Sequence, residues 1–525
     1  MRARLSAICA LVLICSPAFA LDVGLYVTDY MDPQTVQIKP LGGEISTTAK
    51  LFATPGEYEP VSFAVRPDER VEEMFMEAGD LSGPAGRIER DRVRVCSVEG
   101  FHGGDYDIVM ELGRSWHMPA MRRELFWVIV HVPEDARPGT YRGQVTVTSR
   151  GKPIGRLDLE LEVLPFTLEE PPYALGYNYS SPKDPEALTA HLRDMREHGA
   201  TTVAPLYNFH LPVHDDDTAE IGAFIEAYKA AGYTKPLFFA SPMSLLGRLA
   251  GYGPVDSRRF QRKYLACMRT LWEETSRHDV PVIFSIGDEF TNKALPGIEF
   301  AEKLARLAYE ELPQICTTSD MNGYLEVMAM APYLDIATFN NGWDGIDGHN
   351  EGRRLINREF ITEVQQTGAI PWFVNGGRGR FPYGLFFWKM AGYGVQGKVE
   401  WYYNLGDNSR GSVVRVDGPK VWPTVTYERS REGVDDLKYM LKLEQLVADA
   451  KQSGRARPEV RAAEQLIKRI GDGIIDNWTA YREGGEVFPP EDLGIPSSDE
   501  AAGLGRYNAV RRAMAEAIVG LQEGR

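Results

Sequence analysis

Short apolar runs alternate with longer amphipathic stretches from residue 174 to residue 403, and this alternation constrains the fold more than any other feature. The apolar runs have the length of buried strands, and the stretches between them have the spacing of helices. Repeated strand–helix units require parallel strands joined by crossover helices. The predicted strands are residues 174–180, 201–206, 236–241, 281–287, 313–319, 335–340, 369–375 and 397–403. The predicted helices include residues 184–198, 219–231, 258–278, 299–312 and 352–367.

Eight strands of this kind predict a closed (β/α)8 barrel. An open, doubly wound sheet usually has fewer strands and a glycine-rich turn after the first one. Here the first strand leads into Ser180, Ser181 and Pro182, which cannot supply that turn. We therefore expect a TIM-like barrel over residues 173–434.

Residues 21–165 have a different pattern, in which apolar and polar residues alternate in short runs between turn residues. This period of two is typical of half-buried strands, and no part of the segment predicts a long amphipathic helix. We expect an N-terminal antiparallel β-sandwich, separated from the barrel by a proline-rich junction. The clearest strands are residues 59–65, 92–96, 126–132, 140–147 and 157–163.

The last part of the chain, residues 435–525, is polar and helical in its periodicity. Periodic apolar positions recur over residues 437–446 and 460–470, and a final helix is predicted over residues 507–521. We expect a C-terminal helical region attached to the barrel.

The first twenty residues have the pattern of a secretory signal. Arg2 and Arg4 precede an apolar run, and Ala18 and Ala20 fit the small-residue cleavage pattern. The run is shorter than the ~20 residues of a spanning helix, and no later stretch is long and apolar enough. We expect an exported protein, periplasmic or extracellular, with no insertion into the membrane.

The net charge of −16 disfavours nucleic acid and anionic membranes as partners. After removal of the signal, the remaining cysteines are Cys96, Cys267 and Cys316. They allow one disulfide at most, so the fold must rest on hydrophobic cores. The sequence does not indicate an oligomeric state.

The adjacent acids Asp288 and Glu289 are the strongest candidates for catalysis. They follow an apolar strand directly, at the end of the strand where barrels of this class carry their active sites. Two neighbouring carboxylates repel each other, so at least one should have a raised pKa, as a proton donor near neutral pH requires. Successive side chains of a regular strand point to opposite faces, so both acids reach one cavity only if the pleat ends at Gly287.

A second, separate carboxylate is missing at the end of the seventh strand, which closes with Val374 and Asn375. Retaining glycosidases with a protein nucleophile need such a group across the sugar ring. Its absence favours a nucleophile from the substrate, the carbonyl oxygen of a 2-acetamido group. Asp288 would orient that group and stabilise its positive charge, and Glu289 would act as general acid and base.

The ends of other strands supply candidates for sugar binding, because amides and phenols bind hydroxyl groups and indole rings stack on sugar rings. Arg378 and Arg380 can bind an anionic substituent or pair with acids. The candidate sugar-binding residues are Tyr177, Asn178, Tyr207, Asn208, Asn340, Trp343, Asn375, Trp401, Tyr403 and Asp407.

A metal site is not expected. His210 and His214 are four residues apart, but Pro212 between them disfavours a helix and no third ligand is identifiable by spacing. No cofactor is indicated.

Several segments resemble glycoside hydrolase family 123, and the resemblance extends over nearly the whole mature chain. It implies β-N-acetylgalactosaminidase activity with substrate-assisted retention, in which Asp288 and Glu289 match the catalytic pair of the family. The segments are residues 56–65, residues 138–143, Asp288-Glu289, Arg380 with Gly384 and Trp388, and residues 431–436.

Two alternatives remain open at this stage. A glycosidase of another specificity would use Glu400 or Asp407 as a protein nucleophile, and the distance between carboxylates would distinguish it. A barrel that binds carbohydrate without catalysis is the other, and the presence of both Asp288 and Glu289 speaks against it.

Overall fold

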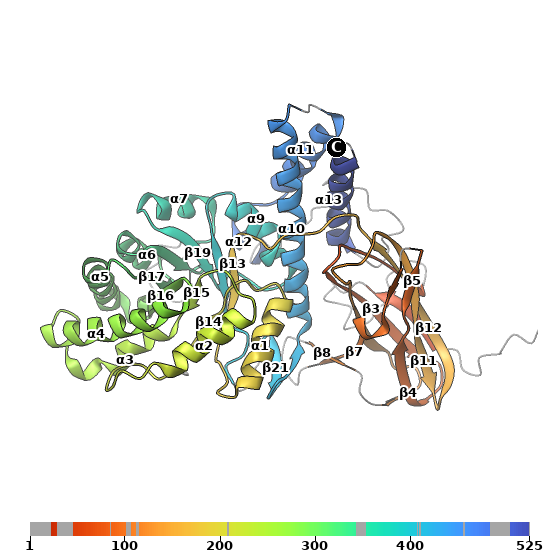
Figure 1. Cartoon of the computed structure of the whole chain (residues 1–525), viewed down its shortest axis with the longest axis horizontal. Helices are drawn as coiled ribbons and strands as arrows, with labels where there is room; N and C mark the ends of the chain where they lie inside the picture. Colours follow the sequence, from red (N-terminus) through yellow and green to blue (C-terminus); the bar gives the residue numbers. More distant parts are fainter. Residues whose placement is uncertain are drawn as a thin grey trace, which may run out of the picture. The chain divides into compact units, whose positions relative to one another are not determined.

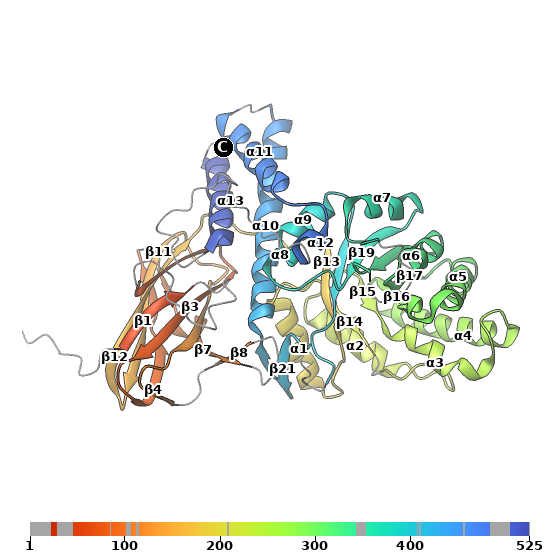
Figure 2. The same cartoon turned by 180° about the vertical axis from the view of Figure 1, so that it is seen from behind.

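The structure is a computed structural model that describes residues 23–28, 46–84, 86–100, 107–111, 115–206, 209–342, 353–406, 408, 411–454, 457–482 and 505–523. The chain divides into two compact units, one built from residues 1–97 and 111–163 and the other from residues 98–110 and 164–525. Figures 1 and 2 show the strand-rich first unit and the helix-rich second unit from opposite sides. We describe each unit by itself.

The strands between Val23 and Val163 form two sheets. One sheet has the strand order β1-β3-β10-β7-β8, and the other has the order β2-β12-β11-β4-β9, with β5 and β6 at its side. All described pairs are antiparallel except β2 and β12, which run parallel. The strands are β1 (Val23–Thr28), β2 (Thr48–Ala53), β3 (Tyr58–Pro67), β4 (Val71–Ala78), β5 (Leu81–Gly83), β6 (Gly86–Ile88), β7 (Val93–Gly100), β8 (Asp107–Glu111), β9 (Trp116–Met118), β10 (Glu124–His131), β11 (Gly139–Ser149) and β12 (Lys152–Val163).

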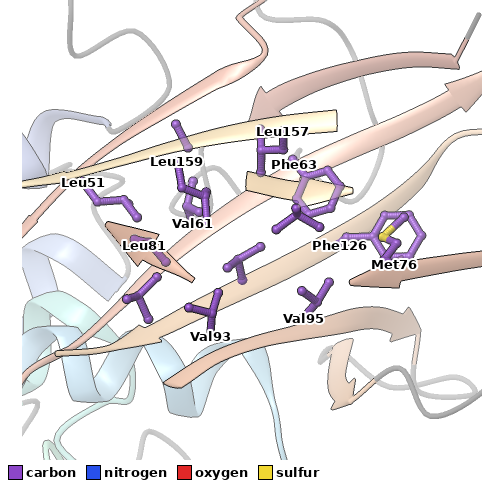
Figure 3. Packing of buried hydrophobic residues seen from close by; sticks show 14 of the residues in the cluster. Leu51, Val61, Phe63, Met76, Leu81, Val93, Val95, Phe126, Leu157 and Leu159 are labelled. Atoms are coloured by element: carbon purple, nitrogen blue, oxygen red, sulfur yellow. The ribbon is translucent and has the colours of Figure 1, made fainter. Parts of the chain in front are cut away.

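Alternate residues of these strands fill one hydrophobic core between the two sheets (Figure 3). Val61 and Phe63 of β3 face Leu157 and Leu159 of β12 across this core. The period of two in the sequence is therefore the period at which side chains enter the core. The expected β-sandwich is confirmed, with the parallel pair β2–β12 as an addition to it.

The second unit contains an eight-stranded sheet with the order β14-β13-β20-β19-β18-β17-β16-β15. Every described pair in this sheet is parallel, and helices lie around the outside of the strands (Figure 1). The strands are β13 (Ala174–Tyr179), β14 (Ala204–Pro205), β15 (Leu237–Phe239), β16 (Val282–Asp288), β17 (Cys316–Met321), β18 (Ile336–Phe339), β19 (Ile370–Val374) and β20 (Gly397–Glu400). The expected (β/α)8 barrel is confirmed.

Some of the barrel helices begin at a residue whose side chain caps them. Asp184 and Ser257 each accept a hydrogen bond from a backbone N–H of the first helical turn, which would otherwise lack a partner. The helices are α1 (Pro185–Glu197), α2 (Ala219–Ala230), α3 (Leu245–Arg248), α4 (Arg258–Thr275), α5 (Ala294–Glu311), α6 (Tyr324–Met330), α7 (Arg358–Gln366), α8 (Arg380–Tyr383) and α9 (Leu385–Ala391). None of the helices in the described ranges is long and apolar enough to cross a membrane.

The C-terminal helices belong to the same compact unit as the barrel. The longest, α10 (Val425–Gln452), starts ahead of the predicted helical region because Thr424 caps it right after the hairpin β21 (Val414–Asp417) and β22 (Lys420–Pro423). It lies beside α11 (Pro458–Asp472) and α13 (Gly505–Glu523) in both views (Figures 1 and 2). The short helix α12 (Trp478–Arg482) follows α11.

Candidate active site

Alternate residues of the barrel strands point into the barrel, where one hydrophobic cluster fills the interior. Because side chains alternate along a strand, residues two or four positions beyond these core residues face the same interior. This relation brings polar residues together at the carboxyl ends of the strands, where barrels carry their active sites. The cluster includes Ala174, Phe238, Ile283, Ile336, Trp372 and Val399. The interior positions beyond it include Asn178, Ser285, Asp320, Asn340 and Trp401.

A β-bulge in β16 changes which side chains face this interior. β16 and β17 are paired at Ser285 and Thr318 and again at Asp288 and Asp320, so β16 contains an extra residue between these two points. Without the bulge Asp288 would point away from the interior, because it is an odd number of residues beyond Ser285. The bulge places Asp288 beside Asp320 instead.

Gly287 is the residue at which β16 leaves its regular pleat. A Cβ at this position would lie 2.0 Å from Cε2 of Phe290 and 3.0 Å from Oγ of Ser319. The Ser285 hydroxyl donates a hydrogen bond to the carbonyl oxygen of Gly287 (3.1 Å). The pleat therefore ends where the sequence predicted, because only glycine leaves room for the ring of Phe290.

Glu289 has a left-handed backbone with φ of 45°, which is uncommon for a residue with a side chain. Its backbone N–H donates to the carbonyl oxygen of Asp320 (2.8 Å), and its Oε2 accepts a hydrogen bond from Nδ2 of Asn292 (3.0 Å). The strand end, the neighbouring strand and the following turn thus hold the half-buried Glu289 next to Asp288.

The pKa of Asp288 is raised to about 6, first by loss of hydration and then by the negative charge of Glu289. The side chain of Asp288 remains exposed to solvent, but protein surrounds most of its carboxylate. Asp288 therefore keeps its proton to a higher pH than an ordinary aspartate would.

A third acid, Asp320, lies at the same level of the barrel. Its side chain is only 6% exposed, and its Oδ1 has no hydrogen-bond partner. Burial raises the pKa of Asp320 well above its usual range, and the charges of Asp288, Glu289 and Glu326 raise it further. Burial and the neighbouring acids therefore both favour the protonated, neutral form of Asp320.

Glu326, at the beginning of α6, supports the turn that carries Glu289. Its carboxylate accepts hydrogen bonds from the backbone N–H of Phe290 (2.6 Å), from the hydroxyl of Thr291 (2.6 Å) and from the backbone N–H of Asn322 (3.1 Å). Burial raises its pKa to about 7 despite these bonds, which favour the charged form. Glu326 therefore links the turn after β16 to the turn after β17 through hydrogen bonds.

These acids do not form a metal centre. Within the described ranges, no group of three or more histidine, cysteine, aspartate or glutamate side chains is arranged to hold a metal ion. His210 is bonded to Asp215 through its Nε2 (2.6 Å).

Of the predicted sugar-binding residues, Asn178, Asn340 and Trp401 lie at interior positions. Asn178 is 1% exposed and its Oδ1 has no hydrogen-bond partner, so this buried acceptor is unsatisfied. Asn340 uses its Oδ1 to accept from the backbone N–H of Gly342 (2.8 Å). Trp401 packs against the interior cluster and is partly exposed. These three remain candidates for contact with a sugar.

Asn375 has a structural partner. It has a left-handed φ of 54°, and its Oδ1 accepts a hydrogen bond from the backbone N–H of Trp401 (2.9 Å). This bond joins the ends of β19 and β20. The amide oxygen of Asn375 therefore helps to hold the backbone of Trp401 in place.

Tyr177, Tyr403 and Glu400 occupy the opposite face of their strands, outside the barrel interior. Tyr177 is stacked on Tyr383 of α8, and the hydroxyl of Tyr403 donates to Asp194 of α1 (2.9 Å). This placement does not support the prediction that the two tyrosines contact sugar, because both pack between the strands and the surrounding helices. Glu400 is 2% exposed and pairs with Nζ of Lys398 (3.2 Å) behind the barrel wall. Its position speaks against a role as nucleophile.

Arg380 is also buried away from the acid pair. It forms two hydrogen bonds with Asp436 of α10 (2.6 Å and 2.8 Å), so its pairing is structural. Arg378 donates to the carbonyl oxygen of Gly411 (2.7 Å). The predicted site residues Tyr207, Asn208, Trp343 and Asp407 lie outside the described residues.

No protein-family model matches the sequence, and no curated protein is significantly similar to it. Among solved structures, the chain is similar to a family 123 glycoside hydrolase from Clostridium perfringens, studied for glycolipid glycan hydrolysis. The two chains share 13% sequence identity with a TM-score of 0.65, over 96% of this chain and 100% of that one. A family 39 glycoside hydrolase from Bacteroides cellulosilyticus WH2 shares 12% identity with a TM-score of 0.37, over 75% of this chain and 82% of that one.

The chain has the fold of the family 123 glycoside hydrolase. In this fold the β-sandwich precedes the barrel and helices follow it, as the sequence predicted.

Sequence reasoning missed two acids near the strand ends, Asp320 and Glu326. The predicted fifth strand ended at residue 319, one residue before Asp320, whereas β17 continues to Met321. A predicted strand longer by one or two residues would have placed Asp320 at its carboxyl end. Position at the carboxyl end of a strand is the reason for which Asp288 was selected. Glu326 gave no such signal, because a glutamate in the first turn of a helix is ordinary.

Proposed function

We propose that this protein is a glycoside hydrolase that removes terminal 2-acetamido-2-deoxy-hexosyl residues, N-acetylgalactosamine foremost, by a substrate-assisted retaining mechanism. The observation that carries the proposal is the pair of consecutive carboxylates at the end of β16, with the pKa of Asp288 raised to about 6. The similarity in fold to the Clostridium perfringens family 123 enzyme, which was studied for glycolipid glycan hydrolysis, supports a glycan as the substrate.

In the first step, the carbonyl oxygen of the 2-acetamido group attacks the anomeric carbon while the glycosidic bond breaks. Glu289 donates its proton to the departing oxygen, and Asp288 accepts a hydrogen bond from the amide N–H. The negative charge of Asp288 stabilises the positive charge that develops on the oxazolinium ring. In the second step, Glu289 takes a proton from water, which attacks the anomeric carbon and reopens the ring with net retention.

The absence of a facing carboxylate supports a nucleophile from the substrate. Among the described residues at the ends of β19 and β20, the one acid is Glu400, and it is buried against Lys398 on the far face. A protein nucleophile would have to lie about 5–5.5 Å from the general acid, across the sugar. Asp407 is the remaining candidate of that kind, so the test must include it.

The experiment is a comparison of aryl 2-acetamido-2-deoxy-glycosides with their 2-hydroxy counterparts, in both the gluco and the galacto configuration. We expect hydrolysis of the acetamido substrates alone, with the galacto form preferred. A thiazoline analogue of the oxazolinium ion should inhibit strongly, because the site would bind the charged bicyclic intermediate better than the substrate. Equal cleavage of the hydroxy substrates, or a sugar trapped covalently on Asp407, would exclude substrate assistance.

We also propose that the enzyme is exported. The support is the signal pattern of residues 1–20, and the test is N-terminal sequencing of the protein secreted by a bacterial host. A mature chain that starts at Leu21 is expected. A protein that stays in the cytoplasm with its first twenty residues uncleaved would refute this proposal.

A further inference from the structure

Asp320 is a buried acid that the proposed mechanism does not use. It is paired with Asp288 across the two neighbouring strands, and the bulge brings both side chains to the interior face. Neighbouring strands are about 4.8 Å apart, so two side chains at paired positions on one face come within hydrogen-bonding reach. The bulge therefore brings the two carboxyl groups to paired positions on one face of the sheet.

Two negative charges at paired positions repel each other, which favours protonation of one of the two carboxyl groups. Asp320 is the more buried of the two, at 6% exposure, whereas Asp288 is exposed to solvent. The charged groups that act on Asp320 are all acids: Asp288 and Glu289 from β16 and the turn after it, and Glu326 from α6. A buried carboxyl group with acidic neighbours and no counter-charge keeps its proton.

Asp320 also has an unused hydrogen-bonding group. Its Oδ1 is buried without a partner, although its backbone carbonyl accepts from the N–H of Glu289 (2.8 Å). A protonated carboxyl group supplies an O–H donor, and the carboxylate of Asp288 is the acceptor paired with it.

We propose that Asp320 is a positioning residue, which keeps its proton and donates a hydrogen bond from its carboxyl hydroxyl to the carboxylate of Asp288. The bond stabilises the ionised form of Asp288 and fixes its orientation. The role of this hydrogen bond in catalysis rests on the proposed function, because Asp288 must be ionised to offset the charge of an oxazolinium ion. It also explains why Asp320 is not a nucleophile, since a neutral carboxyl group attacks poorly.

The test measures the ionisation of Asp288 in the full-length protein without substrate, by infrared difference spectroscopy referenced to Asp288→Asn. Asp320→Asn retains a neutral donor of the same shape, whereas Asp320→Leu removes the donor. Asp279→Asn is the matched control, because this exposed residue has a left-handed φ of 60° that asparagine also adopts.

We expect the protonated carboxyl band of Asp320 at pH 7 in the wild type and in Asp279→Asn, and its loss in Asp320→Asn. The titration midpoint of Asp288 should stay within about half a pH unit in Asp320→Asn and rise by about one unit in Asp320→Leu. Absence of the band, a downward shift of more than about one unit in Asp320→Asn, or no shift in a folded Asp320→Leu would overturn the proposal. If Asp320→Leu does not fold, the carboxyl band of the wild type and the titration midpoint of Asp288 in Asp320→Asn are sufficient to test the proposal.

Activity gives a separate comparison on the aryl 2-acetamido substrate. Asp320→Asn should lower kcat by no more than about tenfold, whereas Asp288→Asn should lower it by about 10²-fold or more. An equal loss in both variants would show that Asp320 acts as an anion and would overturn the inference. If no glycoside is hydrolysed by the wild type, the proposed function fails, while the infrared measurements still test the hydrogen bond.

Discussion

Gly287 lies against the ring of Phe290, so closely that a Cβ on Gly287 would stand 2.0 Å from Cε2 of that ring. Phe290 is itself 2% exposed and packs against Phe300, so its ring cannot turn away freely. The contact holds the bulge in the shape that brings Asp288 to the interior. The geometry of the acid pair therefore depends on a residue without a side chain.

Gly287→Ala should destabilise the protein by about 1–3 kcal/mol, because the added methyl group overpacks a buried contact. It should also lower kcat, since the displaced bulge moves both acids. Urea unfolding and steady-state kinetics measure the two effects. Gly520→Ala in α13 is the control, because a Cβ there meets nothing within 4 Å and alanine favours the helix. Wild-type activity in Gly287→Ala would show that the bulge does not control the site.

Glu289→Gln should affect natural glycosides far more than substrates with good leaving groups. Only a poor leaving group needs protonation, and general acid catalysis contributes about 10²–10⁴ in rate. The measurement is kcat/KM for a series of aryl 2-acetamido-glycosides with leaving groups of increasing pKa. The slope against leaving-group pKa should steepen in the variant. Equal losses across the series would remove Glu289 from the role of general acid.

Asp288→Asn should preserve the fold and raise thermal stability at high pH. The folded-state pKa of about 6 lies above the unfolded value of about 3.9, so the folded protein binds the extra proton between these two values. The stability of the wild type therefore falls as the pH rises from about 4 to about 6, and the loss is complete above that window. Asparagine cannot ionise and escapes this loss.

The measurement for Asp288→Asn is the Tm of variant and wild type at pH 4 and pH 8. We expect little difference at the lower pH and a gain of about 1–3 °C at the higher one. Glu273→Gln, which removes an exposed acid of α4, should show no such dependence on pH. A lower Tm at both values would mean that the Asp288 carboxylate stabilises the fold.

Arg511→Met should release the final helix from the barrel unit. Arg511 of α13 donates from Nε to Asp436 (2.6 Å) and from Nη1 to Glu432 (2.8 Å), and all three side chains are buried. Removal of Arg511 takes a buried donor from Glu432, whereas Asp436 keeps its two hydrogen bonds from Arg380, and we expect a cost of about 3–5 kcal/mol. Limited proteolysis and denaturant unfolding should detect a loosened α13. Arg461→Met on the exposed face of α11 should change neither result.

Local patterns in the sequence were sufficient for the architecture of this protein. A period of two predicted the sandwich strands, and the alternation of apolar runs with amphipathic stretches predicted the strands of the barrel and the order of its helices. The same windows located Asp288 and Glu289 at the end of a strand and marked Gly287 as the place where the pleat ends. These features depend on residues that are close together in the chain, so a short segment of sequence is enough to predict them.

The tertiary structure alone decided which side chains face the barrel interior. The sequence placed Tyr177 and Tyr403 at strand ends, yet in the structure they pack toward α8 and α1. Asp320 is separated from Asp288 by an intervening helix in the chain, and only strand pairing and a one-residue bulge bring the two together. A single extra residue reverses the face of everything after it, and its effect depends on contacts such as that between Gly287 and Phe290. The charge on each acid follows from that arrangement, because pKa values are set by burial and by neighbours that are distant in sequence.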